Sequence, residues 1–214
     1  MNGNVTRALT TTTRRLLLTI LAAIPLVAPA TAAGATGRTP VDPSIMQPAL
    51  NPTFTWTCWR MDEKTMCDGE RHPGWTAVDT GLSCAGGTIY STGTDDRFLR
   101  RWGDAQGLAL HSHGVADTTE TLALNPDMTG TTAQAFGHFS QRFSYGIPGD
   151  ASTRVEVVSG NDVTVVVHGT GLVMHDVGVK SFDIEGNVLF AHGPHDVLDD
   201  FEAAFDKVCD ALQG

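Results

Sequence analysis

The sequence predicts an all-β domain, an antiparallel meander of about eight to ten strands closed into a β-barrel, with a C-terminal α-helix packed on it. Short runs of alternating apolar and polar residues follow one another from residue 53 to residue 192, and turn residues separate them. No helical stretch interrupts these runs, so consecutive strands are expected to be antiparallel neighbours. Closure into a barrel would leave no exposed sheet edge.

The first 33 residues have the pattern of a secretory signal peptide. Arg7, Arg14 and Arg15 precede an apolar run over residues 16–30, which ends in small residues suited to cleavage. The run is shorter than the roughly 20 residues of a transmembrane helix, and no later run is longer. We therefore expect a secreted, extracellular protein without a membrane span. The Arg14-Arg15 pair resembles the twin-arginine export signal, and export of the unfolded chain is the alternative.

Composition divides the rest of the chain into a linker and one domain. Residues 34–52 are rich in Pro, Thr, Gly and Ala without periodicity, which predicts a flexible linker, and residues 53–214 form a single disulfide-linked barrel domain. The chain has 14 basic and 24 acidic residues, and removal of the three signal-peptide arginines leaves 11 basic residues. This acidic balance argues against nucleic acid or an anionic membrane as a partner, and we expect a monomer.

Four cysteines in an exported chain predict two disulfides, with three possible connectivities. A hairpin turn at Asp62 and Glu63 would place Cys58 opposite Cys67, at a spacing of about 4.5 Å that a disulfide can span. Cys84 is then left for Cys209. A zinc site is the competing interpretation, but no closely spaced cysteine pair supports it and we expect no metal.

The central part of the domain is predicted as short strands. They cover residues 88–92, 97–102, 108–115, 120–124, 131–145, 153–158 and 163–168, with turns at Asp95-Asp96 and Gly160-Asn161 among others. Along 131–145 one face is apolar and the other is polar, so the first is expected to face the core. The apolar face consists of Ala133, Ala135, Gly137, Phe139, Phe143 and Tyr145, and Gln141 is the one polar side chain on it.

A hairpin near the C-terminus is expected to organise the sheet. A two-residue turn at Gly186-Asn187 would pair Phe182 with Ala191 and Ile184 with Leu189. A helix over residues 196–212 follows, and an apolar stripe at helical spacing should pack on the barrel wall. The stripe consists of Val197, Phe201, Phe205, Val208 and Leu212.

The histidines are the first candidates for chemistry. His111 and His113 share one strand face, a spacing that metal ligands can use, but His138 is about 13 Å along that face and we interpret all three as outward surface residues. Under the hairpin register His192 lies opposite Ser181 and diagonal to Asp183, which are the parts of a nucleophilic site.

No other feature of the sequence supports catalysis. No Gly-x-Ser-x-Gly elbow surrounds Ser181, and a helix cap by His195 or Asp196 explains this region as well. No phosphate loop, dinucleotide fingerprint, calcium loop or HExxH motif is present. We therefore identify no catalytic residue and expect no cofactor.

Turn and packing motifs recur along the chain, and together they resemble those of small secreted β-barrel proteins of high-GC Gram-positive bacteria. The resemblance implies the fold and no catalytic residues, and the shape is also similar to that of lipocalins, although the Gly-x-Trp of their first strand is missing. The motifs are Cys67-Asp68-Gly69, Arg97 to Trp102, Asn125-Pro126, Thr129-Gly130, Gly178, Asp183, Gly186-Asn187-Val188-Leu189 and Gly193-Pro194-His195.

Three function classes follow. The favoured one is a secreted protein that binds a small apolar or amphipathic molecule in the barrel lumen, with Gln141, Phe139, Phe143 and Tyr145 as ligand-binding residues. The alternatives are a barrel cyclase or isomerase, and an envelope or surface interaction protein whose lumen is packed. If Gln141 faces the ligand, Gln141→Leu should weaken binding without unfolding the protein.

Overall fold

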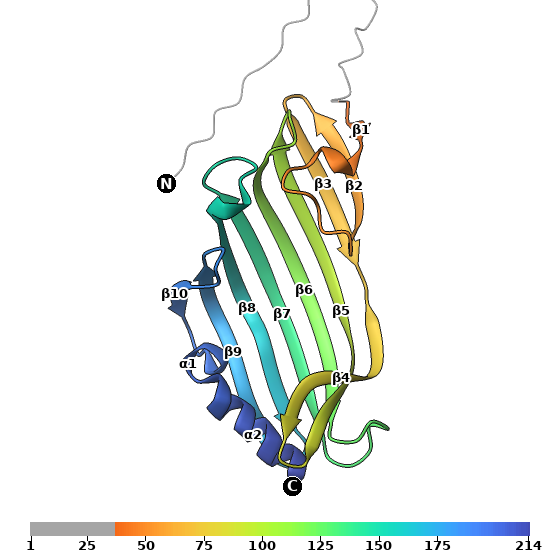
Figure 1. The fold of residues 1–214 in the computed structure, drawn as a ribbon, viewed down its shortest axis with the longest axis vertical. Helices are drawn as coiled ribbons and strands as arrows, with labels where there is room; N and C mark the ends of the chain where they lie inside the picture. The colour runs from red at the N-terminus through yellow and green to blue at the C-terminus, as the bar shows by residue number, and fades with distance from the viewer. Residues whose placement is uncertain (1–36) are drawn as a thin grey trace, which may run out of the picture. The chain divides into compact units, whose positions relative to one another are not determined.

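The structure, a computed structural model, describes residues 37–214; the predicted signal peptide lies outside them. This part of the chain folds into one antiparallel sheet of ten strands (Figure 1), with two short helices at its C-terminal end. The strands are β1 (Thr39–Val41), β2 (Thr55–Met61), β3 (Lys64–Arg71), β4 (Gly74–Cys84), β5 (Gly87–Asp104), β6 (Ala109–Ala123), β7 (Thr132–Tyr145), β8 (Arg154–Val167), β9 (Gly171–Phe182) and β10 (Val188–His192). The helices are α1 (Asp196–Asp199) and α2 (Phe201–Gln213), and the 3₁₀ turns are η1 (Pro43–Ile45) and η2 (Ala151–Thr153).

The predicted all-β fold with a C-terminal helix is confirmed, but its closure into a barrel is not. The strand order is β1-β2-β3-β5-β6-β7-β8-β9-β10, and β4 pairs with β5 beside β3. Within residues 37–214 the two edge strands, β1 and β10, do not pair with each other, so the sheet is open. These two strands are short, with three and five residues, and β1 contains Pro40, features that limit further pairing at an edge. Among the described residues β4 pairs only with β5, so its outer side is a third and longer edge.

The central strands are longer than predicted, because tertiary ion pairs hold residues that sequence patterns assign to turns. Asp95 and Asp96 lie inside β5, where Asp95 forms ion pairs with Arg71 and Arg97, and Asp96 with His72. β6 likewise joins two predicted strands, and β8 runs through the predicted turn at Gly160-Asn161 with a bulge next to it.

One face of the sheet, which we call the helix-side face, carries the odd-numbered residues of β7 and packs against α2. Ala133 on this face is fully buried and shares an apolar cluster with Val208 and Leu212 of α2. Figure 1 shows α2 and β4 at one end of the sheet and the segment around η1 at the other. The alternation predicted for residues 131–145 is therefore confirmed.

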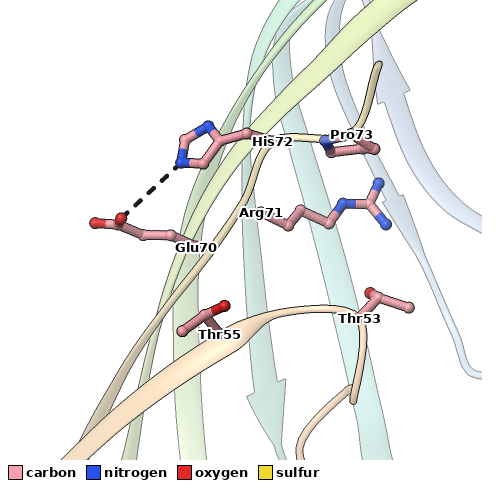
Figure 2. Close-up of a pocket in the computed structure, with 6 residues that line it drawn as sticks. All are labelled: Thr53, Thr55, Glu70, Arg71, His72 and Pro73. Atoms are coloured by element: carbon pink, nitrogen blue, oxygen red, sulfur yellow. Dashed lines mark ion pairs between the residues drawn. The ribbon is translucent and has the colours of Figure 1, made fainter. Parts of the chain in front are cut away.

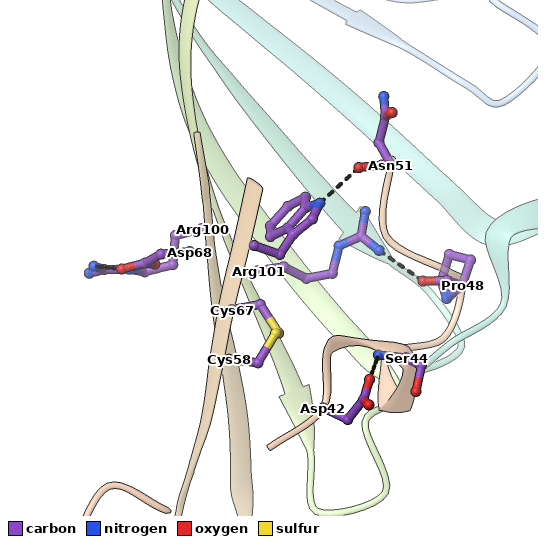
Figure 3. Close-up of a disulfide and its surroundings, with 10 residues drawn as sticks. Asp42, Ser44, Pro48, Asn51, Cys58, Cys67, Asp68, Arg100 and Arg101 are labelled. Atoms are coloured by element: carbon purple, nitrogen blue, oxygen red, sulfur yellow. Dashed lines mark hydrogen bonds and ion pairs between the residues drawn. A yellow bond between two sulfur atoms is a disulfide. The ribbon is translucent and has the colours of Figure 1, made fainter. Parts of the chain in front are cut away.

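The prediction of a flexible linker is wrong from Thr39 onward. Residues 39–41 form β1, which pairs with β2, and the following segment packs on the helix-side face. Met46 is completely buried against Tyr145 and the first disulfide, and Arg101 donates a hydrogen bond through Nη1 to the Pro48 carbonyl oxygen at 2.9 Å (Figure 3). Composition alone indicated flexibility here, whereas burial of these few apolar side chains orders the segment.

Both predicted disulfides are present. Cys58 and Cys67 face each other across β2 and β3, in the predicted register with Met61 opposite Lys64. Cys84, at the end of β4, is bonded to Cys209 of α2 across 125 residues of sequence. Figure 3 places the Asp68–Arg100 ion pair on the other side of the sheet from the Cys58–Cys67 bridge.

The C-terminal hairpin differs from its prediction in register and in position. Phe182 lies opposite Val188, not Ala191, because Asp183 accepts hydrogen bonds from the backbone and side-chain nitrogens of Asn187 and so closes a five-residue loop. The hairpin forms one edge of the sheet and does not organise its centre. The helix predicted over 196–212 is broken at Asp200, whose side chain caps α2 by accepting from the Ala203 amide. Between residues 37 and 214 no helix combines the length and the apolar character needed to cross a lipid bilayer.

Candidate functional site

An apolar cavity of about 300 Å³ lies between the helix-side face, β4 and the C-terminal helices. Every strand from β4 to β9 contributes to its wall, as do α1 and α2. This volume is at the small end of the range for ligand pockets in proteins. Its apolar lining residues are Leu82, Ile89, Leu122, Ala135, Val163, Val165, Met174, Val197, Phe201, Phe205 and Val208.

The cavity is open to solvent, and a disulfide joins the two segments that cover it. Leu82 of β4 and Phe201 of α2 both line it, although they are 41% and 47% exposed, so they lie at its mouth. The Cys84–Cys209 disulfide joins β4 to α2 near the C-terminal end of the helix. The two segments that cover the cavity are thus covalently linked, while the mouth lies next to the break between α1 and α2.

Glu120 is the one charged side chain in the cavity wall, and Thr80 is the other polar one. The hydroxyl of Thr80 donates a hydrogen bond to the Ile89 carbonyl oxygen at 2.8 Å, so its proton already has a backbone acceptor. Glu120 accepts a hydrogen bond at 2.9 Å from the hydroxyl of Ser91, and this hydroxyl accepts in turn from the indole nitrogen of Trp75 at 2.7 Å. A carboxylate is therefore held in place in a mainly apolar site.

The predicted ligand residues share the helix-side face but do not line this cavity. Phe139 and Tyr145 are buried in two separate clusters, Phe139 with Ala116 and Val158, and Tyr145 with Met46. Gln141 and Phe143 are half-buried between these clusters.

Gln141 and Phe143 have charged neighbours on β8. The side-chain nitrogen of Gln141 donates to Glu156 at 3.0 Å, and the guanidinium of Arg154 lies 5.2 Å from the centre of the Phe143 ring. Burial raises the pKa of Glu156, an effect opposed by the charge of Arg154 and by the hydrogen bond from Gln141. The middle of the helix-side face therefore carries charged and amide groups beside the Phe139 cluster, whereas the cavity beside α2 has mainly apolar walls.

A second hollow lies beside the junction of β3 and β4. Figure 2 shows that its side chains do not converge, because Glu70 and His72 point to one side of the strand and Arg71 points to the other. The carboxylate of Glu70 is 3.9 Å from the His72 ring, and Arg71 is paired with Asp95. Its charged side chains thus already have partners, one of them, Asp95, outside the hollow.

The predicted outward histidines lie on the outer face of the sheet. His111 stacks on Trp102 with ring centres 4.6 Å apart, and burial together with the charge of Lys64 lowers its pKa. His138 is exposed and contacts Asp117. Within residues 37–214, no three potential ligand side chains are grouped as a metal ion would require.

The structure does not bring Ser181, His192 and Asp183 together. Ser181 pairs with Phe190 and His192 pairs with Val179, because the hairpin register differs from the predicted one. The Asp183 carboxylate accepts hydrogen bonds from Asn187 within the loop between β9 and β10. The histidine with a buried carboxylate partner is instead His195, whose Nδ1 is 2.9 Å from Asp176.

The sequence analysis did not identify Glu120, although a signal for it exists. Glu120 and Leu122 are two residues apart in the run over 120–124, so their side chains lie on the same, apolar face of the strand. A charged residue among the apolar positions of a strand indicates a polar group that faces inward. The β4 wall had no comparable signal, because bulges interrupt the alternation of residues 74–84.

The chain matches no protein-family model, and no curated protein or solved structure is significantly similar to it. The resemblance to small secreted β-barrel proteins of high-GC Gram-positive bacteria, drawn from turn and packing motifs, stays a prediction.

Proposed function

We propose that this protein is exported and binds one small apolar or amphipathic molecule in the cavity between the sheet and α2. The observation that carries the proposal is an apolar cavity with an open mouth, whose volume of about 300 Å³ suits a small ligand. The signal-peptide pattern and the two disulfides support a location outside the cytoplasm.

Binding is favoured over catalysis by the side chains that line the cavity. Among the described lining residues Glu120 is the only ionisable group, and the Thr80 hydroxyl is engaged with a backbone carbonyl. General acid–base or nucleophilic chemistry commonly needs two cooperating groups within hydrogen-bond reach. A single carboxylate among apolar walls suits recognition of a ligand better.

The proposal is tested by titrating the protein with N-phenyl-1-naphthylamine, an uncharged probe that fluoresces in apolar sites. We expect saturable binding of one probe per chain. Ala135→Leu, which fills the cavity from β7, should weaken binding at least about tenfold. The matched control is Ala191→Leu, the same change on the exposed edge strand β10, which should bind as the wild type does.

Two results would contradict the proposal: no saturable binding by the folded wild type, or equal binding by the Ala135→Leu variant. Gln141→Leu separates the cavity from the site predicted from sequence. If this substitution weakens probe binding and Ala135→Leu does not, the ligand lies over the middle of the helix-side face. Native mass spectrometry of protein secreted by its own host would show whether an organic molecule is released on denaturation.

A further inference from the structure

We infer that the ligand is an amphipathic cation, whose ammonium or similar head group pairs with Glu120 while its apolar part occupies the cavity beside α2. This inference rests on the proposed function and adds the chemical class of the ligand. It is argued from the position of Glu120, from the way its carboxylate is held, and from its lack of a cationic partner within residues 37–214.

The backbone register directs Glu120 toward the cavity. Glu120 of β6 lies between Gly93 of β5 and Ala135 of β7, and Ala135 is part of the cavity wall. A Cβ atom at Gly93 would lie 2.9 Å from the Trp75 ring and 3.0 Å from the Glu120 Cγ. The glycine thus leaves the space in which the indole and the glutamate side chain lie against the sheet.

The carboxylate is positioned through one of its two oxygens. Oε2 accepts from Ser91, which is only 3% exposed and is itself held by the Trp75 indole. No hydrogen bond from the described residues reaches Oε1. This oxygen is free to accept from a ligand, and the relay through Ser91 reduces the entropy cost of orienting the group.

Glu120 differs from the other carboxylates of the helix-side face, which have cationic neighbours; Glu156, although in no ion pair, accepts from Gln141 and is influenced by the charge of Arg154. Asp95 pairs with Arg71 and Arg97, and Asp176 pairs with Lys180. None of the ion pairs within residues 37–214 includes Glu120. A half-buried carboxylate without a cation favours a cationic ligand and disfavours an anionic one, in keeping with the net acidic charge of the chain.

The test compares three probes with the same eight-carbon chain, octylammonium, octan-1-ol and octanoate, by calorimetric titration at pH 7. We expect octylammonium to bind at least about tenfold more tightly than octan-1-ol, because a charge-assisted hydrogen bond replaces a neutral one. Octanoate should bind most weakly.

Glu120→Gln keeps the size of the side chain and the acceptor for Ser91 but removes the charge. It should abolish the preference for octylammonium. The affinity for octan-1-ol should stay within about twofold of the wild-type value. Binding of octan-1-ol therefore also shows that the variant is folded. Glu63→Gln, the same change at an exposed position in the β2–β3 turn, is the control and should retain the preference.

The outcomes separate this inference from the proposed function. If the wild type binds octan-1-ol without preferring octylammonium, or if the preference survives in Glu120→Gln, the inference is overturned and the apolar binding site stands. If the wild type binds neither the three probes nor N-phenyl-1-naphthylamine, the proposed function fails and the inference fails with it.

Discussion

The imidazole Nδ1 of His195 lies 2.9 Å from Oδ1 of Asp176, and both side chains are buried. The same oxygen of Asp176 accepts from the Lys180 ammonium at 3.1 Å. His195 immediately precedes α1, and Asp176 is in β9, so this contact fastens the start of the helical cover to the sheet. The Val177 amide, which donates to the Pro194 carbonyl oxygen, reinforces it.

Loss of the Asp176 carboxylate should destabilise the fold strongly. In Asp176→Asn the buried Lys180 would retain only Asp162 as an anionic partner, and His195 would lose its charged acceptor. Removing one member of a buried ion pair costs about 3 to 5 kcal/mol, and we expect that decrease in the free energy of unfolding measured with urea.

The control for this prediction is the exposed His138–Asp117 pair on the outer face. Asp117→Asn should cost less than about 1 kcal/mol, because solvent screens exposed ion pairs. Equal effects of the two substitutions would show that the buried cluster does not anchor α1.

The two disulfides should contribute unequally to stability. Cys84 and Cys209 are 125 residues apart, whereas Cys58 and Cys67 are separated by nine. In the chain-entropy model the long loop contributes about 4 to 5 kcal/mol and the short one about 2.5 to 3 kcal/mol. Replacing each pair by serines and comparing urea unfolding should therefore give a larger loss for Cys84 and Cys209. A larger loss for Cys58 and Cys67 would contradict the entropic argument.

A side chain at Gly93 should not fit between β5, β6 and Trp75. The Cβ of Gly93→Ala would lie 2.3 Å from the Thr119 carbonyl oxygen and 2.9 Å from the Trp75 ring. Overpacking of this kind costs about 1 to 3 kcal/mol, to be read from the unfolding midpoint.

Gly74→Ala provides the comparison for Gly93→Ala on the paired strand. Its Cβ would be 3.7 Å from the nearest atom, an ordinary contact, so we expect a change within about 0.5 kcal/mol. Similar losses at the two glycines would contradict the close approach of the Thr119 carbonyl oxygen and the Trp75 ring to Gly93.

Glu156 should make stability depend on pH. Burial raises its pKa in the folded chain. A carboxyl group with a raised folded pKa binds its proton more tightly when folded, so its stabilising contribution is complete below the unfolded pKa. That contribution is lost as the pH rises through the folded pKa.

Glu156→Gln should therefore be as stable as the wild type at about pH 4 and more stable at pH 7. Glutamine retains an oxygen that can accept from Gln141, so the change mainly removes the charge. Urea unfolding of both proteins across this range provides the measurement, and Glu63→Gln removes an exposed charge for comparison. A difference that shrinks toward pH 7 would contradict the assigned cause.

The elements predicted correctly are those whose pattern is contained in a short stretch of chain. The alternation over β7 and the two-residue turn at Asp62-Glu63 specify which side chains face each other, and the Cys58–Cys67 bridge follows from them. The errors arose where side-chain contacts, one of them with the distant Arg71, override the turn and alternation patterns. Asp95 continues a strand because Arg71 and Arg97 neutralise it, and Asp183 lengthens the C-terminal loop through Asn187.

The candidate site shows the same division. From the sequence alone came the all-β class, the C-terminal helix, both disulfides and the apolar face of residues 131–145, because a period of two and a cysteine count are local or compositional properties. The tertiary structure decided that the sheet is open, that residues 39–50 pack on it, and that β4 and α2 enclose a cavity with Glu120 in its wall. These features depend on which distant segments of the chain pack on the sheet. The alternation of side chains within one strand shows which face is buried, but it does not show which segment buries that face.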